Sequence, residues 1–519
     1  MKKEYTIAKD ITNMKTILLW TLFFLFSCVC YAEDVTIRYN GETAKVKQKV
    51  KDSVMISVDG AKVNIESLYR SHQLTLRLMG KSEDGQLNLK ANGKVIIKLD
   101  GLTLTSQEGA PLCLKNKKKT EIVVGKGTEN TLTITACNDT ANHKAATIWA
   151  KDKLLFSGKG TLNIIATGDG CRGIKTKKDI TFEDLTLHVT TSGDNLGEKS
   201  FGFGGFDFGG EMPDFSNFPG FGNDSIRRGD FPFPTFEGNF PIPDFENDST
   251  RRGGFSFPPF GGMRPFDNDS IDEGGFPDFG GGFGGKHKYV ASTKGIASKG
   301  KITINSGHIT VRTSTAGAEG IEGKEGIIFN GGHVDVLTTD DAINANATIE
   351  FNGSHVIAIS KNNDAVDSNP KGGFFMPFGN NREQNSDPAI IIKGGTVYAW
   401  SQVGSPEEGL DCDFSPLVIE GGNLFTVGGG MGEMPSVPTN DTAKQPTVLL
   451  IGLNVVKDEP INLYDDNDQL LTSITIPFSL RRSASLVGCP TFKVGNTYTV
   501  KTKGYEKTFT INEPFTVVR

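Results

Sequence analysis

A short phrase of oxygen-bearing residues recurs along the chain. Each copy holds an acid, a small residue, an aliphatic residue and a second oxygen-bearing side chain, and the first three copies begin about 22 to 23 residues apart. The phrases begin at Glu319, Asp341, Asp364 and Glu408 and end at Glu322, Asn344, Asp367 and Asp411. Carboxylate and amide oxygens are the ligands that Ca²⁺ prefers. The pattern therefore predicts a calcium site among these eight residues.

The spacing of the phrase indicates which elements position it. Internal repeats of this length are typical of solenoids, and equivalent side chains of successive β-coils stack about 4.8 Å apart. Short runs alternating aliphatic and polar residues, ended by Gly, Asn or Asp, surround each copy, as in 153–164 and 301–311. The sequence therefore predicts an all-β solenoid. Like charges that face each other destabilise a sheet, so stacked carboxylates call for a counter-charge.

Two columns emerge when the coils are aligned on the small and aliphatic residues of the phrase. Arg172, Lys175 and Lys294 precede the acidic copies, so one edge passes from basic to acidic. These cations are candidates for binding anionic sugars. A third column, His308, His333 and His355, is interpreted as a hydrogen-bonding ladder rather than a metal site. Tyr398 and Trp400 lie on the outward side of a strand, where they either stack on sugar rings or pack against the neighbouring long loop.

The solenoid pattern is predicted to span residues 75–445, with a β-rich lead-in at 33–74 and a small β cap at 447–519. Two Gly-, Phe- and Pro-rich stretches, 196–286 and 370–388, interrupt the pattern and predict disordered insertions. The longer one contains three copies of Asp-Ser followed by Ile or Thr, which resemble the Asp-Ser/Thr-apolar acceptor used for O-glycosylation of exported proteins. Its candidate sites are Ser225, Ser249 and Ser270.

The N-terminus has the layout of a secretory signal over residues 1–32: lysines, a short apolar run and a small residue before Glu33. We therefore expect a secreted or cell-surface protein. An alternative reading takes 25–28 as a lipobox, which would make Cys28 a lipid anchor in the outer membrane. The five remaining cysteines are scattered and are expected to fill the core. The net charge of −6 gives no signal for nucleic acid binding, and no feature indicates an oligomeric state.

Several segments resemble a bacterial extracellular carbohydrate-binding family with a pectate-lyase-like, right-handed parallel β-helix. The resemblance rests on residues 84–87, 95–105, 109–112 and 127–133 and on the coils with Gly-Ile-x-x-Lys and Asp-Ala-Ile. It implies a Ca²⁺-bearing β-helix that binds acidic polysaccharide such as polygalacturonate without established lyase activity. The family's calcium-binding acids would fall on Asp341, Asp364 and Asp367, whereas Glu319 and Glu322 replace shorter acids.

Three functions remain open at this level. The first is calcium-dependent binding of an acidic, pectin-like polysaccharide, without catalysis. The second is a calcium-dependent polysaccharide lyase, in which Ca²⁺ acidifies the proton beside a uronate carboxyl and Lys294 or Arg172 acts as base. The third is a structural surface adhesin, in which the long insertion carries the interaction and the acidic ladder only holds the coils together.

Overall fold

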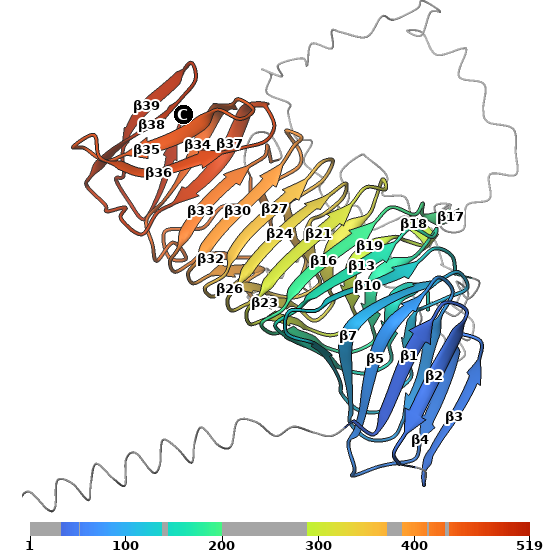
Figure 1. Cartoon of the computed structure of the whole chain (residues 1–519). Helices are drawn as coiled ribbons and strands as arrows, with labels where there is room; N and C mark the ends of the chain where they lie inside the picture. Colours follow the sequence, from blue (N-terminus) through green and yellow to red (C-terminus); the bar gives the residue numbers. More distant parts are fainter. Residues whose placement is uncertain are drawn as a thin grey trace, which may run out of the picture. The chain divides into compact units, whose positions relative to one another are not determined.

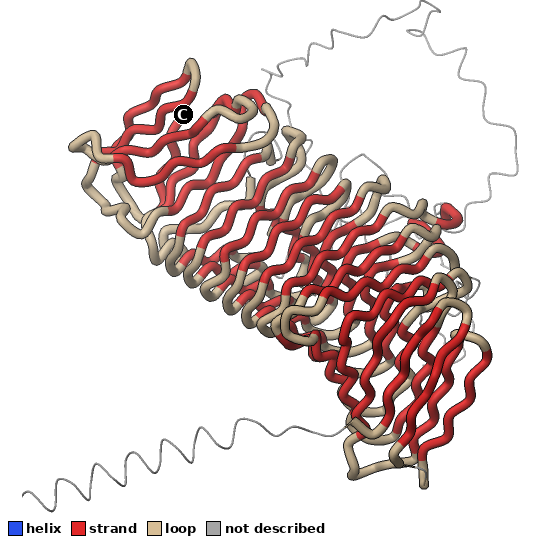
Figure 2. The backbone as a smooth tube through the Cα atoms, in the orientation of Figure 1, coloured by secondary structure: helices blue, strands red, loops and turns tan. Residues whose placement is uncertain are grey.

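The computed structural model describes residues 33–50, 52–137, 144–199, 288–370, 387–412, 415–430 and 435–519. All of its strands belong to one of the chain's two compact units, formed by residues 1–200 and 280–519. Strands stack side by side along this unit (Figure 1), and Figure 2 shows strands and connecting loops without a helix. Among the described residues there is accordingly no helix that could cross a membrane. The prediction of an all-β chain is confirmed.

Each coil contributes one strand to an 11-stranded sheet whose members are parallel from β4 onward. The strands of this sheet are β3 (Val54–Asp59), β4 (Lys62–Ser67), β6 (Gln86–Ala91), β8 (Leu112–Leu114), β11 (Ala146–Ala150), β14 (Arg172–Thr176), β19 (Lys294–Ser298), β22 (Glu319–Gly323), β25 (Ile343–Ala345), β28 (Val366–Ser368) and β31 (Leu410–Asp411).

The coils contribute two further parallel ladders, which belong to a 23-stranded sheet. The β9 ladder holds β9 (Thr120–Val124), β12 (Leu154–Gly158), β15 (Ile180–Phe182), β20 (Ile302–Ile304), β23 (Ile327–Phe329), β26 (Ile349–Phe351), β29 (Ile390–Ile392) and β32 (Leu417–Ile419). The β10 ladder holds β10 (Glu129–Ile134), β13 (Thr161–Ala166), β16 (Thr186–Thr191), β21 (His308–Thr313), β24 (His333–Thr338), β27 (His355–Ser360), β30 (Thr396–Ser401) and β33 (Asn423–Val427). The chain visits the 11-stranded sheet, the β9 ladder and the β10 ladder in turn, which is the topology of a β-solenoid.

The predicted lead-in supplies the first strands of this stack. β1 (Val35–Asn40) and β2 (Thr43–Gln48) form an antiparallel hairpin, and β1 then pairs in parallel with β5 (Leu74–Ser82). β3 and β4 form a second hairpin, which joins the 11-stranded sheet through β4 and β6. The long strand β7 (Val95–Ser106) pairs with both β9 and β10. The two ladders therefore diverge from a single strand.

The C-terminal strands close the other end of the stack. β34 (Thr447–Val455) pairs with β37 (Leu480–Gly488) on one side and with β40 (Phe515–Val518) on the other, and β37 also pairs with β33 of the last coil. A separate four-stranded sheet contains β36 (Leu470–Thr475), β35 (Pro460–Tyr464), β38 (Thr497–Thr502) and β39 (Tyr505–Thr510).

The core consists of columns of identical or similar side chains. On the 11-stranded sheet, fully buried aliphatic residues occupy the same position in successive strands, for example Ile296, Ile321 and Ile343. In the β9 ladder, Phe329 stacks on Phe351 with ring centroids 4.9 Å apart. Cys113, Cys171, Cys412 and Cys489 are buried in the hydrophobic clusters, which confirms their predicted core-filling role, whereas Cys137 is only partly buried.

Two short strands, β17 (Leu196–Lys199) and β18 (Lys288–Ala291), pair antiparallel at the base of the long insertion. Most of the predicted insertion at 196–286, the signal segment 1–32 with Cys28, and most of the shorter insertion lie outside the described residues. The candidate glycosylation sites Ser225, Ser249 and Ser270 lie there too.

Candidate functional site

The outward face of the 11-stranded sheet carries the predicted charged columns. The structure places Trp149, Lys175, Ala297, Glu322, Asn344, Asp367 and Asp411 in one ladder of directly paired residues. This order confirms the column alignment inferred from the sequence. In the second column, Ala146 pairs with Arg172, and Lys294 pairs with Glu319.

Close packing at the small position explains the second residue of the phrase. A Cβ on Gly320 would lie 2.4 Å from the carbonyl oxygen of Ala342 in the next coil and 2.5 Å from a methyl group of Val336. Larger side chains at this position would push neighbouring coils apart, so small residues recur beside the acids.

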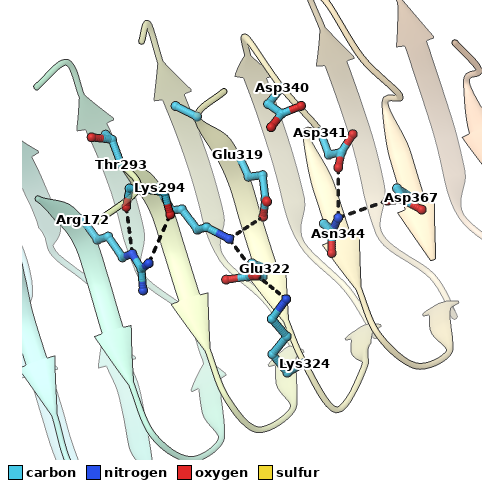
Figure 3. Close-up of polar contacts among 12 residues, drawn as sticks. Arg172, Thr293, Lys294, Glu319, Glu322, Lys324, Asp340, Asp341, Asn344 and Asp367 are labelled. Carbon is cyan, nitrogen blue, oxygen red and sulfur yellow. Dashed lines mark hydrogen bonds and ion pairs between the residues drawn. The ribbon is translucent and has the colours of Figure 1, made fainter. Parts of the chain in front are cut away.

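The middle of the charged face is an internal ion network (Figure 3). Lys294 Nζ lies 3.0 Å from Glu319 Oε2 and 2.7 Å from Glu322 Oε1, and Lys324 Nζ lies 2.6 Å from the same Glu322 oxygen. The Lys294 and Glu322 side chains are only 10% and 7% exposed. Basic and acidic columns therefore neutralise each other where they meet.

The charges within this network shift the pKa values of the two glutamates in opposite directions. Burial raises the pKa of Glu322, but Lys294, Lys324 and Arg172 outweigh burial and lower that pKa well below the usual range. Burial raises the pKa of Glu319, and Lys294 compensates only in part because the Glu322 charge opposes it. Glu322 is thus the carboxylate that holds both lysine ammonium groups.

This arrangement corrects the roles predicted for several residues. Glu319 and Glu322, proposed as weaker calcium ligands, are committed to Lys294 and Lys324. Lys294, proposed to bind sugar, has its ammonium group between two carboxylates and is 8% exposed. A charge neutralised inside the fold is not presented to an anionic ligand.

The two other predicted basic residues are also held by the protein. Arg172 Nε donates to the Ser292 carbonyl at 3.0 Å, and Nη2 donates to Ser292 Oγ at 3.2 Å. Lys175 is 6% exposed. The expectation that Arg172 and Lys175 bind sugar is therefore not supported by their positions.

The C-terminal part of the face gathers the strongest calcium candidates. Asn344 Nδ2 donates to Asp341 Oδ2 at 2.9 Å and to Asp367 Oδ2 at 3.1 Å (Figure 3). In the next coil, Asp364 Oδ1 accepts a hydrogen bond from the Glu408 amide at 2.5 Å. Asp341, Asp364 and Asp367 are all at most 7% exposed. The structure thus brings these acids together on adjacent coils.

The acids in this cluster repel one another. Burial raises the pKa of Asp364 well above its usual value, and the charges of Asp411 and Asp341 raise it further. Glu408 belongs to the same group, and its Oε2 accepts a hydrogen bond from the Ser436 amide at 2.6 Å. A bound cation would remove this electrostatic cost.

The donor chemistry of the cluster suits Ca²⁺, which takes six to eight oxygen ligands. Within the part of the chain that the structure describes, no three or more His, Cys, Asp or Glu side chains lie close enough together to hold a metal ion by themselves. An ion at this cluster would therefore need amide, backbone or ligand oxygens besides the carboxylates of Asp341, Asp364, Asp367 and Asp411.

Trp400 is part of the core rather than a sugar-stacking platform. It is 3% exposed, its Nε1 donates to the Phe425 carbonyl at 3.2 Å, and it packs in the hydrophobic cluster that includes the C-terminal strands. Tyr398 is partly buried and stacks on Trp400 with ring centroids 5.6 Å apart. Of the two sequence interpretations, packing is confirmed, but the partner that the described residues show is the C-terminal β region in place of the expected long loop.

The histidine column lies in paired positions of the β10 ladder, but ring stacking rather than the predicted hydrogen bonding joins its described side chains. His308 pairs with His333 and His333 with His355, with ring centroids 5.2 Å and 4.9 Å apart. Burial, with the charge of His333 as a second cause, lowers the pKa of His355.

Sequence reasoning gave no role to Lys324, the lysine of a Gly-Ile-x-x-Lys coil, which completes the ion network. Its signal was available, because a lysine follows the strand directly in several coils, at Lys151, Lys177, Lys299 and Lys324. The columns considered from the sequence ended with the strand and did not include the turn.

The fold and face together define a β-solenoid with a charged outer sheet. A family model described as a carbohydrate-binding domain-containing protein matches residues 43–201 and 267–365. A carbohydrate-binding domain-containing protein of Acetivibrio thermocellus is 24% identical over 160 residues, which are 30% of this chain and 54% of that protein. The chain thus spans about half the length of this curated relative.

A solved polysaccharide lyase-like protein from C. thermocellum, a gadolinium derivative, aligns with 62% of this chain and 93% of its own. The identity is 14% and the TM-score is 0.33. The family model that matches residues 43–201 and 267–365 is therefore the comparison that indicates a carbohydrate-binding domain.

Proposed function

We propose that this chain is an exported, non-catalytic carbohydrate-binding protein for acidic polysaccharide, and that the binding depends on Ca²⁺ at the C-terminal end of the charged face. The similarity to carbohydrate-binding domains supports the general class. The observation that carries the calcium site is the burial of the Asp341 and Asp364 carboxylates, which repel each other and the partly exposed Asp411.

Ca²⁺, when bound, supplies positive charge that compensates these carboxylates and accepts further oxygen ligands. The protein's part is to hold the acids in fixed positions: the Asn344 amide orients Asp341 and Asp367, and the Glu408 backbone amide orients Asp364. Because the side chains do not form a complete coordination sphere by themselves, oxygens of a uronate-containing glycan are suitable additional ligands.

No contact in the charged face favours the lyase alternative. Both residues considered as bases are engaged by the protein, Lys294 by two carboxylates and Arg172 by Ser292. The adhesin alternative depends on the long insertion, which lies outside the described residues.

Isothermal titration calorimetry of polygalacturonate binding tests the proposal. The same titration is carried out once in calcium buffer and once in chelator. We expect binding in calcium, loss of binding in chelator, and loss of binding in Asp364→Asn. Asp194→Asn is the matched control because Asp194 is an exposed acid on the same side of the sheet. Equal affinity with and without Ca²⁺ would refute the calcium requirement, and absence of binding under every condition would refute the function.

A further inference from the structure

Seven successive turns at one border of the 11-stranded sheet are rich in lysine. They connect this sheet with the strands that follow it and comprise residues 68–73, 92–94, 115–119, 151–153, 177–179, 299–301 and 324–326. We call them the basic edge. Their basic residues are Arg70, Lys94, Lys115, Lys117, Lys118, Lys119, Lys151, Lys153, Lys177, Lys178, Lys299, Lys301 and Lys324, and their acids are Asp152, Asp179 and Glu325.

Backbone hydrogen bonds place lysines of successive turns in register. The Lys151 amide donates to the Leu114 carbonyl oxygen at 2.9 Å, and the Lys177 amide donates to the Ala150 carbonyl oxygen at 3.2 Å. The Lys299 amide likewise donates to Thr176 at 3.1 Å. Each of these lysines therefore follows the same strand position in its coil, and neighbouring positions are about 4.8 Å apart.

Most of these side chains reach solvent. Lys94, Lys115, Lys119, Lys151 and Lys301 are all exposed. Two others have acidic partners: Lys153 lies 2.7 Å from Asp179, and Lys324 lies 2.6 Å from Glu322. The basic edge thus differs from the interior of the charged face, where Lys294 is buried between two carboxylates.

Basic residues strongly outnumber acids on this border of the coils. The basic edge holds 13 Lys and Arg residues against three acids, whereas the whole chain has a formal net charge of −6. The turns between the β9 and β10 ladders instead carry an amide ladder, in which Asn330 donates to Asn305 at 2.8 Å and Asn352 donates to Asn330 at 2.8 Å.

We propose that the basic edge is a linear binding track for the carboxylates of an acidic polysaccharide, which would lie along the stacking direction of the coils. This inference rests on the proposed function and assigns it a second contact surface, separate from the calcium cluster. The track runs from the β4 turn to the β22 turn, whereas the calcium candidates occupy β25, β28, β31 and their preceding loops.

Two physical arguments connect this surface with a linear polyanion. Lysines about 4.8 Å apart lie well within the screening length of about 10 Å at 0.1 M salt, so they repel one another unless an anion lies beside them. A row of regularly spaced charges also matches a polymer with regularly spaced carboxylates better than it matches a single small anion. Focused positive potential of this kind raises the association rate of an anionic ligand.

The test compares two double variants that carry the same charge change in the same two coils. Lys115→Gln with Lys151→Gln removes two exposed lysines from the basic edge. Lys126→Gln with Lys159→Gln removes two exposed lysines from the turns between the β9 and β10 ladders. Thermal unfolding followed by circular dichroism verifies that both variants retain the fold.

Each protein is titrated in calcium buffer with polygalacturonate, with uncharged hydroxyethyl cellulose and with duplex DNA. We expect the basic-edge variant to bind polygalacturonate about five- to tenfold more weakly at low salt, and the control to stay within about twofold of wild type. We expect duplex DNA to bind more weakly than polygalacturonate, because carbohydrate recognition adds to charge.

Equal affinity of the two variants for polygalacturonate would overturn the track. The track would also be overturned if wild type bound DNA as tightly as polygalacturonate and the basic-edge variant lost the same affinity for both. The basic edge would then be a general polyanion surface. If Asp364→Asn abolishes binding while the lysine variant has no effect, the track fails but the proposed function stands. If wild type binds none of the polysaccharides, both fail.

Discussion

The two borders of the 11-stranded sheet carry opposite charge and use it differently. The border where the chain enters this sheet, which we call the acidic edge, comprises the loops before its strands. In the described residues its acids are Glu83, Asp84, Glu108, Asp169, Asp194, Asp340, Asp341, Asp364, Glu407 and Glu408, with two lysines, Lys144 and Lys361. The border where the chain leaves the sheet is the basic edge.

Burial distinguishes the calcium-candidate acids of the acidic edge from the exposed lysines of the basic edge. Asp341 and Asp364 of the acidic edge are 2% and 7% exposed, whereas the lysines at the start of the basic-edge turns include the exposed Lys115 and Lys151. A buried charge needs compensation within the fold or from a bound ion. An exposed charge is available to a partner. The comparison teaches that burial decides whether a charge on this sheet needs a counter-charge or is available to a partner.

Breaking the ion network between the edges should have the largest effect. In Glu322→Gln, Lys294 keeps Glu319 but loses its closer carboxylate, and Lys324 loses its carboxylate partner. Removal of one member of a buried pair leaves a poorly compensated charge, so we expect a loss of about 3 kcal/mol in the free energy of unfolding. Chemical denaturation at neutral pH measures this loss, and a change below about 1 kcal/mol would show that the network does not stabilise the fold.

The same variant gives a pH signature. Because the folded-state pKa of Glu322 is lowered, its stabilisation is present above the unfolded-state pKa of about 4.3 and is lost as pH falls through the folded-state value. We therefore expect the stability difference between wild type and Glu322→Gln to be constant near neutral pH and to shrink in acid. A difference that grows as the pH falls would contradict this assignment.

Calcium should act on the acidic edge with the next largest effect. At 100 times its dissociation constant, an ion that binds only the folded state stabilises it by about 2.7 kcal/mol. We expect Ca²⁺ to raise the unfolding temperature of wild type but not of Asp364→Asn. In chelator, by contrast, we expect Asp364→Asn to be more stable than wild type, because the substitution removes a charge that Asp411 and Asp341 repel.

Differential scanning calorimetry with Asp194→Asn as control makes this comparison. An equal calcium response in wild type and Asp364→Asn would place the ion elsewhere.

The dependence of glycan affinity on ionic strength should differ between wild type and the basic-edge variant, and this effect should be smaller than the calcium effect. Exposed charges are screened as salt increases, so wild-type affinity for polygalacturonate should decrease with added NaCl. The Lys115→Gln, Lys151→Gln variant should show a weaker decrease, with the difference from wild type, about 1 kcal/mol at low salt, disappearing at high salt. Parallel salt curves for this variant and wild type would exclude these lysines from the contact.

The amide ladder between the β9 and β10 ladders should have the smallest effect. Asn330 links Asn305 and Asn352 at the surface, and Asn330→Ala removes both hydrogen bonds. We expect a loss of about 1 kcal/mol in stability and unchanged glycan affinity, measured by denaturation and calorimetry. Weaker glycan binding would show that this third border also contacts the ligand.

The repeat phrase predicted the fold and the register because each coil repeats the same packing problem. A small residue beside an inward aliphatic residue fixes the position of the strand, so the columns from Trp149 to Asp411 could be aligned without coordinates. The alternation of aliphatic residues likewise indicated which faces form the core.

The partners of the charged side chains could not be predicted in the same way. Aligning the coils of this chain with one another shows that Lys294 and Glu322 occupy neighbouring coils. It does not show that the lysine reaches diagonally between two carboxylates. Trp400 was ambiguous because its environment depends on the C-terminal strands, which are distant in sequence and have no coil repeat. Period-2 patterns identify an outward face without indicating whether another part of the chain covers it.

Polygalacturonate affinity in a four-way comparison tests the central claim most directly, namely that buried acids bind through Ca²⁺ and exposed lysines bind the polymer itself. Wild type, Asp364→Asn, the Lys115→Gln, Lys151→Gln variant and the Lys126→Gln, Lys159→Gln control are titrated in calcium and in chelator. The account predicts calcium-dependent binding that Asp364→Asn abolishes, the basic-edge variant weakens and the control retains. Wild-type binding that neither chelator nor either test variant changes would contradict it.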